Sequence, residues 1–113
     1  MNYSLQLRVQ CGDDKDESDV ALQYEVQYDT DGSSKITLNS REDENWGQVM
    51  QLKGFEGPGP CRPFDLLVIR REEGFLCFLD GIEQSILPYR LEDQVPNHVI
   101  LNGDLETYRL LLL

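Results

Sequence analysis

Alternation of apolar and polar residues is the clearest pattern in this chain, and residues 20–28 carry it without a break. Valine, leucine and tyrosine occupy every second position of this segment, which places their side chains on one face of a β-strand. The opposite face then carries Gln23, Glu25 and Gln27, spaced about 7 Å apart on a pleated surface. Such a row is either a solvated sheet face or the floor of a polar binding groove.

The same period of two recurs along most of the chain, between segments rich in glycine, proline and aspartate. No window shows a helical stripe with capping residues, so short strands joined by turns are predicted. The nearly continuous apolar run at 64–69 predicts a strand covered on both faces. This pattern predicts an all-β fold, an antiparallel two-sheet β-sandwich. The expected strands are residues 3–10, 20–28, 35–39, 46–52, 64–69, 75–79, 82–90, 99–101 and 108–113.

Length, charge and cysteine content narrow the classes of protein further. The 113 residues suffice for a single domain, spanning 1–113. A net charge of −11 argues against nucleic acid and anionic membrane as partners, because both require clustered lysine and arginine. Three widely spaced cysteines favour reduced thiols over a disulfide framework or a zinc site. With no leader and no membrane-length apolar run, we expect a cytoplasmic protein, or one exported by a non-classical route, without metal or cofactor.

Three segments, 22–28, 39–40 and 46–51, together resemble the core motif of the galectins, a family of β-galactoside-binding lectins. That motif reads roughly Leu-His-Phe-Asn-Pro-Arg-Phe, then Asn-Ser or Asn-Thr, then Trp-Gly-x-Glu-x-Arg, and the spacings agree without a gap. The asparagine of the second segment and the tryptophan of the third are kept. The His, Asn and Arg of the first segment and the Glu and Arg of the third segment are replaced. The resemblance implies that the sugar-contacting positions are Gln23, Glu25, Gln27, Asn39, Trp46, Val49 and Gln51.

The resemblance extends over nearly the whole chain and implies a jelly-roll sandwich of the galectin, or concanavalin-like, type. It continues through residues 62–66, the hairpin at 75–81, the segment 89–91 and the strand entry at 103–105. Galectins usually carry further residues before the strand that corresponds to 3–10. The resemblance therefore implies a domain shortened by one or two strands at its N-terminus.

The chemistry of the implied site differs from that of the family. Trp46 offers the apolar side of galactose a flat platform, or it is a partly buried tryptophan without a ligand. Asn39 offers donors and an acceptor to a ring hydroxyl, or it satisfies loop backbone. Gln27 and Gln51 replace two arginines whose charge-assisted contacts are worth roughly 1.5–3 kcal/mol each. Weak or no binding of simple β-galactosides is therefore expected.

Two functions stay open at the level of the sequence, and neither is enzymatic. The only histidine, His98, falls outside the implied groove, and no pair of carboxylates shows catalytic spacing. The first function is a lectin with altered or weakened affinity for a β-galactoside-type glycan or glycoprotein. The second is a protein-interaction or oligomerisation module that has lost sugar binding. The apolar residues 108–113 predict a terminal strand edge covered by a neighbouring loop, or by a second copy in a homodimer or another protein partner.

Overall fold

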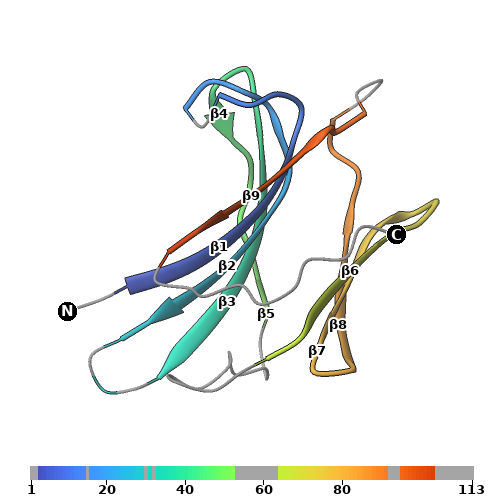
Figure 1. The fold of residues 1–113 in the computed structure, drawn as a ribbon. Helices are drawn as coiled ribbons and strands as arrows, with labels where there is room; N and C mark the ends of the chain where they lie inside the picture. The colour runs from blue at the N-terminus through green and yellow to red at the C-terminus, as the bar shows by residue number, and fades with distance from the viewer. Residues whose placement is uncertain are drawn as a thin grey trace.

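Two antiparallel β-sheets face each other in the computed structural model, which describes residues 3–14, 16–29, 31, 33–52, 64–91 and 95–103 (Figure 1). The described residues contain no helix, and thus none with the length and apolar character needed to cross a membrane. The predicted all-β sandwich is confirmed. The strands are β1 (Tyr3–Gln10), β2 (Val20–Tyr28), β3 (Ser34–Glu42), β4 (Asn45–Trp46), β5 (Met50–Leu52), β6 (Leu66–Arg70), β7 (Gly74–Leu79), β8 (Ile82–Pro88) and β9 (His98–Asn102).

The larger sheet has the order β4-β3-β2-β1-β9, and β5 also pairs with β3. The smaller sheet has the order β6-β7-β8. Strands β1 to β4 pair in sequence as hairpins, as do β6 to β8. The β7–β8 hairpin turns at Asp80 and Gly81, both with positive φ. This is the turn that an Asp-Gly pair predicts, because two left-handed residues match the twist of the flanking strands.

Two details of the predicted strands are wrong. Residues 46–52 form two short pieces, β4 and β5, rather than one strand. The strand predicted at 64–69 is β6, and it is not covered on both faces. Leu66 and Val68 pack against the core, whereas Leu67 between them is 42% exposed. The predicted strand at 108–113, and with it the expected partner edge, lies outside the described residues.

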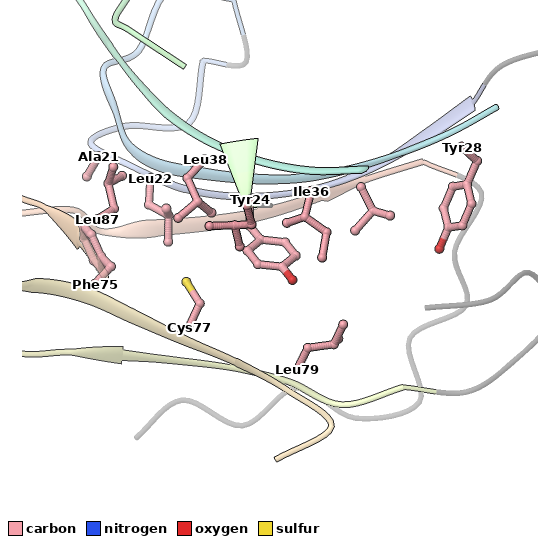
Figure 2. Close-up of a cluster of buried hydrophobic side chains, with 12 residues drawn as sticks. Ala21, Leu22, Tyr24, Tyr28, Ile36, Leu38, Phe75, Cys77, Leu79 and Leu87 are labelled. Atoms are coloured by element: carbon pink, nitrogen blue, oxygen red, sulfur yellow. The ribbon is translucent and has the colours of Figure 1, made fainter. Parts of the chain in front are cut away.

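The core fills the space between the sheets with alternate residues of their facing strands (Figure 2). Leu22 and Tyr24 of β2 point from the larger sheet toward Cys77 of β7, and these side chains are at most 2% exposed. The Tyr24 hydroxyl donates a hydrogen bond of 2.6 Å to Oε1 of Gln84 in β8, which joins the two layers. Since every second residue of β2 from Leu22 onward is used in this way, Gln23, Glu25 and Gln27 are directed to the opposite face.

Burial of Cys77 is expected to make the protein less stable at alkaline pH. Burial raises the pKa of its thiol from 9.0 to about 12, because the thiolate would lose its hydration. The folded protein keeps this proton where the unfolded chain releases it, so the stabilisation is complete below pH 9 and declines above it. We expect the free energy of unfolding to be about 2 kcal/mol lower at pH about 10.5 than at pH about 8.

Urea denaturation at the two pH values measures this difference. The variant Cys77→Ala lacks the thiol and should keep only a smaller decline, contributed by Tyr24 and Cys11, whose pKa values are also raised by burial. An equal decline in both proteins would assign the effect to other groups.

Candidate functional site

The polar residues of β2 lie on the side of the larger sheet that faces away from the core. The strand register places Gln6 and Arg8 of β1 opposite Glu25 and Gln23. On the other side of β2, Thr37 lies opposite Glu25. Side chains that are directly opposite in a sheet share a face. We call this surface the polar face, and it consists of Gln6, Arg8, Gln23, Glu25, Gln27, Thr37, Asn39, Arg41, Trp46 and Gln51.

Six of the seven predicted site residues share this surface. Trp46 joins it because β4 pairs it with Arg41, and Gln51 joins it because β5 pairs it with Thr37. Val49 is the exception, because it lies between β4 and β5, outside any strand pair, and is 56% exposed. The six residues are Gln23, Glu25, Gln27, Asn39, Trp46 and Gln51.

Glu25 is the centre of a hydrogen-bonded cluster on the polar face. Gln6 donates from Nε2 to Oε2 of Glu25 at 2.6 Å. Gln27 donates from Nε2 to Oε1 of Glu25 at 2.8 Å. Both carboxylate oxygens are therefore held by amides from two strands, which fixes the orientation of the charge.

Arg8 of β1 belongs to the polar face, although the sequence interpretation did not assign it to the site. Its Nε donates to Oε1 of Gln23 at 2.8 Å, and the residue is only 9% exposed. Burial lowers the pKa of Arg8, and the nearby charge of Arg41 lowers it further, whereas Glu25 and Asp16 act in the opposite direction. The guanidinium is thus a buried positive charge that the structure balances with nearby carboxylates.

Trp46 is held by two arginines. The guanidinium carbon of Arg41 lies 5.2 Å from the centroid of the indole, and that of Arg8 lies 5.4 Å from it. Both are within the range of cation–π attraction. Arg41 is itself anchored, because its Nε and Nη2 donate to the carbonyl oxygen of Ser18 at 3.1 and 2.7 Å. The indole remains 40% exposed, so the protein presents a fixed aromatic surface to solvent.

Asn39 is hydrogen-bonded to the segment that follows β4. Its Oδ1 accepts hydrogen bonds from the backbone N–H of Ser40 at 2.8 Å and from Nη1 of Arg90 at 3.0 Å. Its Nδ2 donates to the carbonyl oxygen of Gly47 at 3.1 Å. The sequence left two interpretations of Asn39, a contact to a sugar hydroxyl or hydrogen bonds to loop backbone. The observed contacts match the second interpretation. Asn39 therefore helps to set the position of Trp46, which directly precedes Gly47.

His98 lies at the opposite edge of the sheet. It begins β9, opposite Gln10 of β1, and β9 is separated from β4 by three strands. Its Nδ1 lies 2.6 Å from Oδ1 of Asn97. The histidine is therefore distant in strand order from Trp46, as expected from the sequence.

The chain combines a two-sheet β-sandwich with a polar sheet face and an exposed tryptophan, which is the architecture of a lectin domain. A family model described as galactoside-binding lectin matches residues 1–111. Galectin-7 of Rattus norvegicus is 26% identical over 98 residues, which cover 87% of this chain and 68% of that protein. Sheep galectin-11, solved in complex with glycerol, has the same fold with a TM-score of 0.72 and 23% identity, over 91% of this chain and 71% of that one.

The chain therefore belongs to the galectin family of galactoside-binding lectins. Members of this family are carbohydrate-binding proteins and not enzymes. The resemblance found in the sequence motif is confirmed at the level of the family.

Proposed function

We propose that the polar face binds a glycan and that its affinity for simple β-galactosides is weak. The observation that carries this proposal is the position of Trp46. Trp46 is 40% exposed, and its indole lies against Arg41 on the same face as the row of Gln23, Glu25 and Gln27. An aromatic face beside hydrogen-bonding groups suits a sugar, which has an apolar C–H side and polar hydroxyls.

The expected weakness follows from which groups can reach a ligand. Gln27 and Gln51 stand where the family motif has arginines, and a neutral amide forms weaker hydrogen bonds than a guanidinium. Arg8 and Arg41 do not replace them, because they are only 9% and 6% exposed and support the indole from within the protein. The polar face thus keeps an aromatic platform but has fewer charged donors for sugar oxygens.

Titration with lactose tests this proposal directly. Trp46 is the only tryptophan of the chain, so its fluorescence reports on the polar face alone. We expect a dissociation constant of about 1 mM or weaker, corresponding to a binding free energy near −4 kcal/mol. Saturation at micromolar lactose would contradict the proposed loss of affinity.

A glycan array separates this function from the alternative. Under the proposal, a coherent set of glycans binds the protein, binding is lost in Trp46→Ala, and it is partly kept in Trp46→Phe, which retains an aromatic ring. The alternative is a protein-interaction module, favoured by the exposed apolar residues Leu67 and Ile82 of the smaller sheet, which are 42% and 62% exposed. A silent array together with a stable oligomer in light scattering would support that alternative.

A further inference from the structure

We infer that a cavity at one end of the sandwich binds a small carboxylate with an aromatic body. The cavity has a volume of about 400 Å³, which is within the range of pockets that hold small organic molecules. It is distinct from the row of Gln23, Glu25 and Gln27, because none of these residues lines it. The inference therefore goes beyond the glycan binding proposed above and assigns a second class of ligand to the protein.

The inner wall of the cavity is apolar and belongs to both sheets. Ala21 near the start of β2 and Phe75 near the start of β7 lie at the same end of the core (Figure 2), and both are buried. Leu91, which follows β8, is also buried, and Val95 and Pro96 line the cavity from the segment before β9. These side chains offer a ligand contacts to hydrocarbon and no hydrogen bonds, so they favour an organic anion over an inorganic one.

Tyr89 is fixed in the wall of the cavity by contacts at both of its ends. Its ring packs edge-to-face on Phe75, with the ring centroids 5.1 Å apart and an angle of 81° between the planes. Its hydroxyl donates a hydrogen bond to the carbonyl oxygen of Arg71. The protein itself therefore orders the aromatic wall, which lowers the entropy cost of packing a ring against it.

Two arginines supply the charge of the cavity, Arg70 and Arg90. Arg90 donates from Nη1 to Oδ1 of Asn39 at 3.0 Å and to Oγ of Ser40 at 3.4 Å. Its Nε and Nη2 have no acceptor among the described residues, so these donors are left to a ligand. Arg70 ends β6, and its guanidinium carbon lies 5.8 Å from the centroid of the Tyr89 ring. Within the described part of the chain, neither arginine pairs with a carboxylate.

The local charge of the cavity differs in sign from that of the whole protein. None of the described residues that line it is acidic, and Asp19, Glu72 and Glu73 of neighbouring segments lie outside its lining. The net charge of −11 opposes an anion at long range, but this effect is screened beyond about 8 Å at physiological ionic strength. A guanidinium pairs with a carboxylate through two parallel hydrogen bonds. Arginines beside an apolar, aromatic wall therefore suit a carboxylate that carries a ring.

Titration with three compounds of similar size tests the inference. Phenylacetate carries the carboxylate, phenylacetamide is neutral, and phenethylamine carries a positive charge. In ¹H–¹⁵N spectra at neutral pH, the backbone amides of Ala21, Phe75 and Leu91 report binding. We expect phenylacetate to bind with a dissociation constant of about 1 mM or tighter, roughly tenfold more tightly than phenylacetamide. Phenethylamine should bind no better than phenylacetamide, and the amide of Gln51 on the polar face should not shift.

Two adjacent arginines provide a matched pair of variants. Arg70→Gln and Arg71→Gln remove the same charge from neighbouring positions, but only Arg70 lines the cavity. Arg70→Gln should weaken the binding of phenylacetate about threefold, as for a partly exposed ion pair, and Arg71→Gln should leave it unchanged. Arg90→Gln should reduce the affinity for phenylacetate to that for phenylacetamide. Because Arg90 also holds Asn39, the pair at 70 and 71 keeps the test valid if Arg90→Gln does not fold.

Equal affinities for phenylacetate and phenylacetamide would overturn the inference. An equal loss in Arg70→Gln and Arg71→Gln would also overturn it, because the preference would then belong to the overall charge and not to the cavity. The same holds if phenylacetate produces no saturable shift at Ala21, Phe75 and Leu91. None of these outcomes affects the proposed glycan binding, which is tested with lactose and the glycan array.

Discussion

Replacement of Gly74 by alanine is expected to lower the free energy of unfolding by about 3 kcal/mol or more. Gly74 begins β7 and is paired with Pro88 at the end of β8. A Cβ atom at this position would overlap the carbonyl oxygen of Leu87 and lie 2.8 Å from its carbonyl carbon and 2.9 Å from Cα of Pro88. These are backbone atoms, so the clash is relieved only if the two strands separate, and Leu87 is fully buried in the core.

Gly81 provides a matched control within the same hairpin. Its φ is +82°, and a Cβ atom there would meet no other atom within 4 Å. Gly81→Ala should therefore show only the strain of a left-handed residue, about 1–2 kcal/mol. Urea denaturation of both variants, followed by circular dichroism, gives the two values. A loss in Gly74→Ala no larger than in Gly81→Ala would contradict the close approach of β7 and β8.

The fold could be predicted from the sequence where the relevant signal is local. Residues 3–10 and 20–28 alternate without interruption, and the observed bounds of β1 and β2 agree with the prediction. A different signal was misleading for residues 64–69, because a nearly continuous apolar run does not show how many layers cover a strand. The smaller sheet packs on one side only, so Leu67 is left exposed. The break between β4 and β5 was also missed, because an apolar-polar pattern carries no information on where pairing to β3 is interrupted.

The candidate site was predicted as a row of residues but not as a set of contacts. Alternation alone places Gln23, Glu25 and Gln27 on one face, and the register confirms it. The donors that hold Glu25 and Gln23 come in part from β1, and the register between two strands is set by their packing rather than by either sequence alone. For the same reason, the contact of Trp46 with Arg8, three strands away in the sheet, could not be predicted.

Replacement of Arg41 by methionine is expected to lower the free energy of unfolding by about 3 kcal/mol. Methionine keeps the apolar stem of the side chain but lacks the guanidinium, whose Nε and Nη2 both donate to the carbonyl oxygen of Ser18. The substitution leaves that oxygen without these donors and removes one of the two cations that hold the indole of Trp46. Urea denaturation measures the loss, and the emission of Trp46 should shift to longer wavelength in the folded variant as its ring becomes more hydrated.

Arg71→Met is the matched control for this experiment, because it makes the same chemical change at an exposed position beyond β6. Surface substitutions of this kind usually change stability by less than about 0.5 kcal/mol, and the emission of Trp46 should stay as in the unmodified protein. If Arg41→Met were as stable as Arg71→Met, the guanidinium of Arg41 would have no structural role under Trp46. If it were less stable but its Trp46 emission were unchanged, the contact with Ser18, and not the cation–π contact, would account for the loss. The two readouts thus separate the anchoring of the loop at Ser18 from the positioning of the aromatic platform on which the proposed glycan binding depends.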